Sequence, residues 1–461
     1  MATNRIRHYL LAVAFALAPL VGAYAATYYA SPTGTPDAAC TESDPGTIQA
    51  AVDKAVPGSS WTNCDEVLLL PGTYDFSGTE WSGKNAVEIK SRNYLTIRSA
   101  NGQRDSVRLV GAGGGSDFFA RAFYATCVSR IRGLTISNFF GNANFTGVAA
   151  YSKNKDQLQL VDCVVAGNIG TNAAIVYAAT ADGCLFAANT NRTGTGVCYY
   201  TSLITNCTFI GNCAYLGGGA SHCYAIDSLF SNNVATAYGG AFDGNASGGN
   251  SGQYTARRCT FVGNFAAGGG GAVSYAIVDG CTFIGNSCPS NKTGGAVLAS
   301  GGATDCTFIG NSAGTGGALS GGTSTRCHFQ DNIAFTRSGA IDQGYAYDCE
   351  FIGNSSDGSA GAIYLYNRTL SVCLFSNNWQ GQAQGRFSEA RVPSRFRIVS
   401  SLQTVPLQEV PSTAFTDVQS AIASSSATSR RTATTVEQAT PLAATAGLKT
   451  IRRRGRGVPA I

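Results

Sequence analysis

A six-residue phrase that recurs along the chain restricts the fold more than any other feature. CTFIGN occurs at residues 207–212, 281–286 and 306–311, and CTFVGN at 259–264. Looser copies extend the pattern, with repeat asparagines 21 to 31 residues apart and a weak first copy, SNFFGN, at 137–142. A Gly-Gly-Ala motif or a close variant follows in phase, ending at Ala220, Ala241, Ala272, Ala296, Ala318, Ala340 and Ala362. Two motifs in phase over seven units predict a stack of similar layers.

The spacing within one unit predicts short strands joined by tight corners. Cysteine and phenylalanine stand two residues apart, so both side chains face the same side of a strand. Asparagine suits a corner because it tolerates the left-handed conformation, and the glycine pair permits another turn. Such units stack at the strand spacing of about 4.8 Å. We therefore predict an all-β fold, a right-handed parallel β-helix of about a dozen coils.

Leucine-rich repeats are the alternative architecture with a similar phrase. They have units of comparable length and read L-x-L-x-x-N, which Cys-x-Phe-x-x-Asn mimics. They need several leucines in each unit, whereas residues 201–380 contain eight in all. The Gly-Gly-Ala corner also leaves little room for a helix, so the β-helix is favoured.

The segment before the repeats predicts a helix-plus-strand cap. Asp44 and Pro45 suit the start of a short helix reaching Asp53, with Asp44 as its N-cap. A buried strand at 66–70 follows, and the runs 94–98 and 107–110 predict strands of the first coils. Such a cap would cover the exposed core and strand edges at the end of a solenoid.

Four segments follow from these patterns. Residues 1–25 combine basic residues, a short apolar run and an Ala-x-Ala site, as in secretory signal peptides. Residues 26–112 form the cap and first coils, and residues 113–380 the β-helix repeats. Residues 381–461 are predicted to be a disordered Ser/Thr/Ala-rich tail, and hold 11 Lys and Arg against 4 Asp and Glu. The remaining chain is nearly neutral, which gives no footprint for nucleic acid.

The paired motifs resemble the Gly-Gly-Ala/Ile and Phe-x-x-Asn repeats of the chlamydial polymorphic outer membrane proteins, over about residues 137–378. More broadly, the chain resembles secreted, pectin-lyase-like right-handed β-helix proteins, and the IQAAVD and LLLPGTY phrases resemble their N-terminal cap. The resemblance implies a secreted protein, extracellular or at an outer-membrane surface. It implies the fold more strongly than any activity.

Nine of the 16 cysteines occupy the repeat position. Their spacing above 20 residues does not suit a zinc site, so we predict a buried ladder of small side chains. Cys40 and Cys64 are the better candidates for a disulfide. Four more cysteines lie off the ladder and are candidates for pairing: Cys198, Cys213, Cys223 and Cys288.

Charged and aromatic residues provide the candidates for chemistry. Six aspartates lie one or two residues before the repeat cysteine or its serine equivalent, and are expected to cap turns rather than bind a cation: Asp162, Asp182, Asp227, Asp279, Asp305 and Asp348. Arg257, Arg258 and Arg326 could face an anionic sugar. Several tyrosines could stack on sugars or cover the glycine-rich corners: Tyr199, Tyr200, Tyr224, Tyr275, Tyr345, Tyr347, Tyr364 and Tyr366. Of the histidines, His328 is expected to face solvent.

We therefore predict an exported, non-catalytic repeat protein that acts as a structural or adhesive surface rod. No catalytic, cofactor-binding or metal-binding residue is assigned, and no cofactor is expected. A carbohydrate or a host or cell-surface ligand is the expected partner, with no nucleic acid and no transmembrane segment in the mature chain. The alternative is a polysaccharide lyase or glycoside hydrolase on the same scaffold. Such an enzyme would need a groove where the repeat breaks, and the candidate break lies between Asp243 and Arg258.

Overall fold

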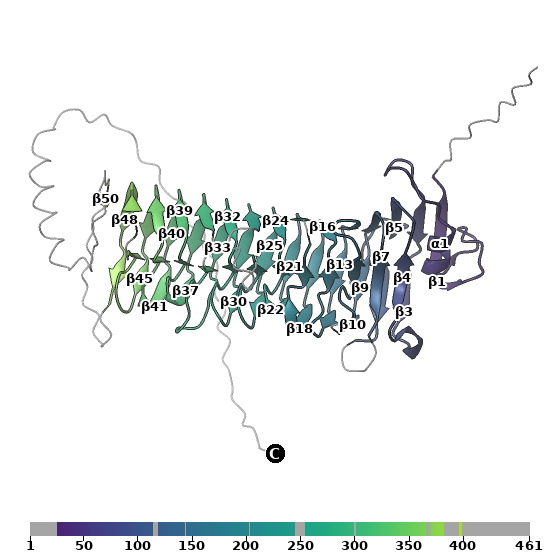
Figure 1. Ribbon diagram of the computed structural model, residues 1–461, viewed down its shortest axis with the longest axis horizontal. Coiled ribbons are helices and arrows are strands. Elements are labelled where there is room, and N and C mark those ends of the chain that lie inside the picture. The colour runs from purple at the N-terminus through teal and green to yellow at the C-terminus, as the bar shows by residue number, and fades with distance from the viewer. Residues whose placement is uncertain are drawn as a thin grey trace, which may run out of the picture. The chain divides into compact units, whose positions relative to one another are not determined.

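The computed structural model describes residues 25–113, 119–142, 144–201, 203–244, 254–298, 301–365, 368, 370–381 and 396–398. Among these residues, one α-helix, α1 (Ile48–Lys54), and one 3-10 turn, η1 (Thr79–Trp81), accompany a set of short β-strands. The strands stack in register as parallel rows, one coil upon the next (Figure 1). The predicted parallel β-helix is confirmed, and the leucine-rich alternative is wrong.

Successive coils pass through up to four rows of strands in the same order, which we number sheets I to IV; some coils have no strand in sheet III. Sheet I contains β1 (Thr27–Thr35), β2 (Glu66–Leu69), β5 (Leu95–Ser99), β8 (Ser129–Arg132), β12 (Leu158–Val161), β16 (Thr180–Asp182), β20 (Leu203–Thr205), β24 (Tyr224–Ile226), β28 (Thr255–Arg257), β32 (Ile277–Asp279), β35 (Gly302–Thr304), β39 (Thr323–Thr325), β43 (Tyr345–Tyr347) and β47 (Leu370–Ser371). Sheet II contains β3 (Gly72–Phe76), β6 (Val107–Gly111), β9 (Thr135–Ser137), β13 (Val164–Ala166), β17 (Leu185–Ala187), β21 (Thr208–Ile210), β25 (Leu229–Ser231), β29 (Thr260–Val262), β33 (Thr282–Ile284), β36 (Thr307–Ile309), β40 (His328–Gln330), β44 (Glu350–Ile352), β48 (Cys373–Ser376) and β50 (Phe396–Ile398).

The other two rows complete the coil. Sheet III is in two parts, β10 (Phe140–Gly141), β14 (Ile169–Gly170), β18 (Thr190–Thr195), β22 (Cys213–Leu216), β26 (Val234–Ala235) and β30 (Phe265–Ala266), then β37 (Ser312–Thr315), β41 (Ile333–Arg337), β45 (Ser355–Ser356) and β49 (Trp379–Gln380). Sheet IV contains β4 (Asn85–Ile89), β7 (Arg121–Ala125), β11 (Ala150–Ser152), β15 (Val176–Tyr177), β19 (Cys198–Tyr199), β23 (Ala220–Ser221), β27 (Phe242–Asp243), β31 (Val273–Ser274), β34 (Val297–Leu298), β38 (Leu319–Ser320), β42 (Ile341–Asp342) and β46 (Ile363–Tyr364). All named strand pairs are parallel except β48 with β50.

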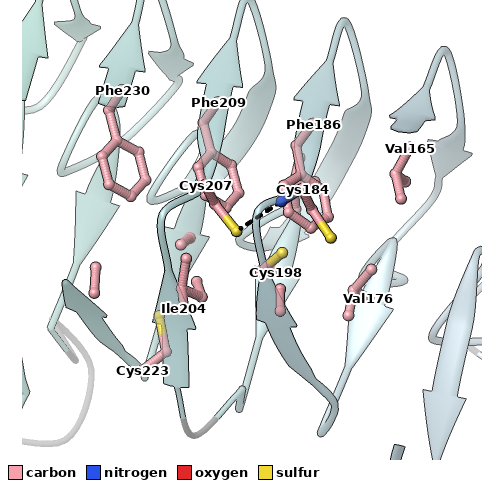
Figure 2. Packing of buried hydrophobic residues seen from close by; sticks show 14 of the residues in the cluster. Val165, Val176, Cys184, Phe186, Cys198, Ile204, Cys207, Phe209, Cys223 and Phe230 are labelled. Carbon is pink, nitrogen blue, oxygen red and sulfur yellow. Dashed lines mark hydrogen bonds between the residues drawn. The ribbon is translucent and has the colours of Figure 1, made fainter. Parts of the chain in front are cut away.

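The repeat phenylalanines form a continuous stack inside sheet II. From Phe186 to Phe375, neighbouring ring centroids lie 4.5 to 5.0 Å apart, and the ring planes are within 3 to 11° of parallel. Figure 2 shows Phe186 and Phe209 above Cys184 and Cys207 of the same coils, with Phe230 in the next coil. Burial of these rings removes a large apolar area from water in every coil. The inward direction predicted for both repeat residues is confirmed.

The repeat cysteines form a second interior ladder, held by hydrogen bonds. The Cys207 sulfur accepts from the Cys184 backbone nitrogen at 3.4 Å, the dashed contact in Figure 2. The Cys281 sulfur likewise accepts from the Cys259 nitrogen at 3.4 Å and lies 3.2 Å from the Ala256 carbonyl oxygen. Each thiol thus satisfies buried backbone groups at the corner between sheets I and II.

The repeat asparagines point inward, so our prediction that they themselves adopt the left-handed conformation at the corner was wrong. The left-handed residue at this corner is the one before each asparagine, such as Gly285 (φ 59°) or Gly310 (φ 61°). Asn311 itself is fully buried. Its side-chain nitrogen donates to the Phe283 carbonyl at 3.1 Å and to Asn332 Oδ1 at 2.9 Å. The weak copy at 137–142 was also misaligned, because Phe139, not Asn142, takes the asparagine position below Asn168.

The Gly-Gly-Ala corner needs glycine because coils approach closely there. The first glycine is left-handed, for example Gly294 (φ 70°). A Cβ on the next one, Gly295, would collide with the Gly317 carbonyl oxygen of the following coil. The same clash recurs along the stack, so side chains are excluded from this corner by the coil spacing.

The N-terminal helix covers the first coils as predicted, but with a different N-cap. Thr47, not Asp44, caps α1, since its hydroxyl accepts from the Ala50 nitrogen at 3.1 Å. Asp44 instead accepts from the Ala39 nitrogen in the preceding loop. The side chain of Gln49 pairs with both backbone groups of Glu88 in β4, at 2.8 and 3.2 Å. It protects the first edge of sheet IV as another strand would.

The predicted disulfide is wrong, because Cys40 and Cys64 are both free and buried. Their sulfurs contact different neighbours, the Ala38 carbonyl and the Trp61 carbonyl. The off-ladder cysteines are free as well. The signal peptide predicted at 1–25 lies outside the described residues except for residue 25. The tail predicted at 381–461 also does, except for Gly381 and β50, a strand we did not predict.

Candidate functional site

The corner between sheets I and II gathers charged side chains from successive coils. Asp227, Arg258, Asp305 and Arg326 all occupy it in the left-handed conformation, with φ between 49 and 53°. Arg258 donates to both carboxylate oxygens of Asp227, at 2.7 and 2.8 Å. Arg326 binds Asp305 in the same two-pronged way, at 2.7 and 2.8 Å. The arginines lower the pKa of both carboxyl groups, since each donates hydrogen bonds to the charged form.

The six repeat aspartates lie at the predicted corner, but our reason was wrong. Asp182 and Asp279 end strands of sheet I, and the other four take the left-handed position that follows. Five of them, all but Asp348, bind side chains of other coils rather than nearby backbone. Asp279 binds Arg257 at 2.7 Å, and Asp182 accepts from the Thr205 hydroxyl at 2.6 Å. Stacking places these partners in adjacent coils, about one strand spacing apart, so that each aspartate reaches a side chain of the neighbouring coil.

The predicted break in the repeat does not bring Asp243 and Arg258 together. Asp243 ends β27 in sheet IV, whereas Arg258 follows β28 at the far end of sheet I. Asp243 is fully buried, and its carboxylate accepts from Ser274 Oγ at 2.7 Å and Ser221 Oγ at 3.2 Å. Ser221 Oγ also lies 2.7 Å from His222 Nδ1. Residues 245–253, within the break, lie outside the described residues.

Tyrosines form a stacked row on the outside of sheet IV. The rings of Tyr124, Tyr151 and Tyr177 are nearly parallel, with centroids 5.4 and 5.2 Å apart. The Arg121 guanidinium lies 4.6 Å from the Tyr151 ring centroid, and burial lowers its pKa to about 10. We missed this row because only the pairing of the three strands in register brings the tyrosines together. The signal was the tyrosine at the same place in each strand.

The tyrosines that we did predict have mixed surroundings. Tyr200 and Tyr275 occupy the corner between sheets IV and I in the left-handed conformation, and thus cover a corner. The ring of Tyr199 packs edge-on against His222, and the rings of Tyr345 and Tyr364 are covered by Arg368 and Arg337. Tyr347 ends β43 in sheet I, and Tyr366 lies outside the described residues. Tyr200 and Tyr224 are the predicted tyrosines with exposed rings, at 40% and 41%.

His328 faces outward from sheet II between two buried neighbours. Its Nδ1 lies 3.0 Å from Glu350 Oε2 in the next coil, and its Nε2 lies 3.3 Å from Gln330 Oε1. These contacts hold the ring against the sheet. The half-buried histidine is therefore part of a polar row on the outer face of sheet II.

Two shallow depressions lie on the outer face of sheet I. The first, of about 400 Å³, is lined mainly by Arg130, Arg132, Gln159 and Asp182. The Arg130 guanidinium binds Gln159 Oε1 at 3.0 Å and lies over the Trp61 ring. The second, of about 530 Å³, includes the Arg257–Asp279 pair and Tyr224. We missed Arg130 and Arg132, although alternation in the SRIR phrase at 129–132 places both outward.

The described residues were also searched for groups of metal ligands and for membrane-spanning helices. No group of three His, Cys, Asp or Glu side chains in the described part of the chain could hold a metal ion. Burial raises the pKa of Cys163, Cys184 and Cys198 well above the ordinary thiol range, so these thiols stay protonated and are poor ligands. No helix within the described ranges is long and apolar enough to cross a membrane.

Its rows of parallel strands make the chain a parallel β-helix protein. A model of the Chlamydia polymorphic membrane protein repeat matches it at residues 348–366, which include β44 and the following Gly-Ala corner. No curated protein matches the sequence significantly.

Solved structures similar to the chain include three polysaccharide lyases. A pectate lyase is 15% identical, with a TM-score of 0.32, covering 76% of this chain and 80% of that one. A rhamnogalacturonan lyase is 11% identical, with a TM-score of 0.32 and coverage of 76% and 87%. A PL6 family alginate lyase is 12% identical, with a TM-score of 0.40 and coverage of 83% and 58%.

Proposed function

We propose that this chain is an exported, non-catalytic protein of the cell surface whose β-helix serves a structural or adhesive role. The observation that carries the proposal is the pairing of its charged groups. Arg258 and Arg326 each direct two N–H groups at an aspartate of the preceding coil, and Arg257 binds Asp279. A polysaccharide-cleaving site needs carboxyl or basic groups that face the substrate. These groups face one another instead.

The buried carboxylate of Asp243 also supports a non-catalytic role. Asp243 is fully buried, and so are the two serines that hydrogen-bond to it. A sugar ring has no direct access to this carboxylate. We therefore give Asp243 a structural role, in which hydroxyl groups of adjacent coils satisfy its buried oxygens.

A carbohydrate or another component of a cell surface is the proposed ligand. Tyr200 and Tyr224 keep roughly two fifths of their surface exposed, and Lys155 lies 4.5 Å from the Tyr200 ring centroid. Flat rings with a polar edge suit sugar faces and mixed polar surfaces. The match to a polymorphic membrane protein repeat supports a location at an outer surface.

Retention of the purified chain on immobilised glycans and on intact cells tests this proposal. Tyr200→Ala combined with Tyr224→Ala should lower retention several-fold. Tyr238→Ala, which removes a similarly exposed ring elsewhere, should leave it unchanged. Equal losses in both variants, or no retention on any surface of a broad panel, would contradict an adhesive role. Protease treatment of intact producing cells should remove the chain if it is at the surface.

A polysaccharide lyase or glycoside hydrolase is the second candidate. The depression lined by Arg130, Arg132 and Asp182 favours it, because it places a carboxylate and two guanidinium groups on one open face. Turnover that is lost in Asp182→Asn or Arg132→Ala would support this candidate over the first.

A further inference from the structure

The outer face of sheet II carries no charged side chain over seven consecutive coils. From β13 to β36, the outward residues of the described strands are Val, Ala, Leu, Thr, Ile and Ser. The adjoining strands β22, β26 and β30 of sheet III add Cys213, Val234 and Phe265. We call this surface, from β13 to β36 with β22, β26 and β30, the neutral face. Its strands lie side by side in Figure 1.

The neutral face exposes large apolar side chains in a regular order. Ile210 and Ile284, which end β21 and β33, are 42% and 39% exposed. Val234 and Phe265, which begin β26 and β30, are each 37% exposed. Large contiguous apolar surfaces on soluble proteins commonly mark an interaction site. Ionisable side chains of sheet II lie on either side of this face, with Asp75 and Arg108 before it and His328 and Glu350 after it.

We infer that two copies of this chain associate through their neutral faces. The first argument is area. Seven strands of sheet II and three of sheet III, at about 4.8 Å per coil and roughly 10 Å per strand, cover about 500 Å² on each copy. The total of about 1,000 Å² over two copies reaches the lower limit expected of a specific interface.

The second argument is periodicity. Side chains on the neutral face stand in rows one strand spacing apart, as the residue-for-residue register of β21, β25, β29 and β33 shows. Another β-helix with the same rise has rows at the same interval, so ridges and grooves match over the whole length. A two-fold arrangement presents the same patch on both copies. With no charged group on either face, no ion is desolvated when the two sheets pack.

Sedimentation of the purified chain over a range of concentrations tests this inference, which does not rest on the proposed function. The wild type should show a reversible dimer. Ile284→Glu should raise the dimer dissociation constant by about a hundredfold or more, because each of two copies buries a charge. Leu203→Glu is the matched control, since Leu203 is 38% exposed but lies on sheet I, and it should leave the dimer intact.

Two results would overturn the inference. One is a wild-type chain that stays monomeric at every concentration, and the other is a dimer that survives Ile210→Glu combined with Ile284→Glu. If these variants do not fold, hydroxyl-radical labelling of the wild type replaces them. Phe265 and Ile284 should lose reactivity as the concentration rises, while Leu203 should not. Unchanged labelling of Phe265 and Ile284 in a sedimenting dimer would place the interface elsewhere.

Discussion

The hydroxyl of Ser228 makes the hydrogen bonds that the repeat cysteines make. It accepts from the Cys207 backbone nitrogen at 3.1 Å and donates to the Ile226 carbonyl at 2.8 Å. One coil earlier, the Cys207 sulfur accepts from the Cys184 nitrogen. Serine therefore fits a position otherwise filled by cysteine, because the position needs a small side chain that both donates and accepts. The ladder is architectural.

Substitution of a ladder cysteine should separate hydrogen bonding from thiol chemistry. Cys281→Ser should change the free energy of unfolding by less than about 1 kcal/mol, because the hydroxyl replaces the acceptor for the Cys259 nitrogen. Cys281→Ala should lower it by about 1–3 kcal/mol, because that N–H is left buried without its partner. Urea unfolding of both variants measures the difference. Equal losses would show that the hydrogen bond contributes little.

Glycine in the Gly-Gly-Ala corner should be far less replaceable than glycine at the asparagine corner. Gly295→Ala should lower the free energy of unfolding by about 1–3 kcal/mol or more, because the methyl group meets the Gly317 carbonyl. Gly310→Ala is the control: its Cβ would meet nothing within 4 Å, although its φ is 61°. It should lose only about 1 kcal/mol, as Ala188 already adopts this conformation at the same corner. The reverse order of losses would contradict close coil packing.

The corner ion pairs should be visible in the titration of their carboxyl groups. The pKa of Asp305 is lowered chiefly by its hydrogen bonds to Arg326. A lowered folded-state pKa gives a stabilisation that is present above the unfolded pKa and lost as the pH falls through the folded value. Arg326→Gln should raise the Asp305 pKa towards its ordinary value, as measured by NMR of the carboxyl carbon. The pKa of Asp227, paired with Arg258, should not change.

The Gln49 side chain should stabilise the first edge of sheet IV. Gln49→Ala removes both hydrogen bonds to the Glu88 backbone, and we expect a loss of about 1–2 kcal/mol. Amide hydrogen exchange at Glu88 should become faster. Asp53→Ala, which removes only the contact of Gln49 with Asp53 Oδ1, should leave that exchange rate nearly unchanged. Slow exchange at Glu88 in both variants would mean that other groups protect this edge.

The repeat pattern was enough to predict the β-helix and the inward direction of cysteine and phenylalanine. Both inferences depend on residues close together in the sequence, where a period of two fixes the side of the strand. The role of the asparagines was not predictable in this way. Asn286 accepts from Asn264, 22 residues earlier, and that contact becomes apparent only when coils are stacked in register.

The ion pairs at the corner between sheets I and II likewise could not be predicted from one repeat unit. Arg258 lies next to Cys259 in the sequence, yet it pairs with Asp227, 31 residues away across the longest unit. A reading of one unit at a time predicts local turn capping for the aspartates and free arginines. In the structure, the partner of each arginine is an aspartate of the adjacent coil, because a bidentate ion pair one strand spacing away is stronger than a local hydrogen bond. The same stacking separates Asp243 from Arg258.

We propose that the β-helix binds a surface ligand and does not cleave polysaccharides. The most direct measurement incubates the purified chain with acidic and neutral polysaccharides and follows new reducing ends and unsaturated uronate absorbance. We predict no turnover by a chain that is folded and rich in β-structure, and identical baselines for the wild type, Asp182→Asn and Arg132→Ala. Robust turnover that disappears in Asp182→Asn or Arg132→Ala would contradict the account and place an active site on sheet I.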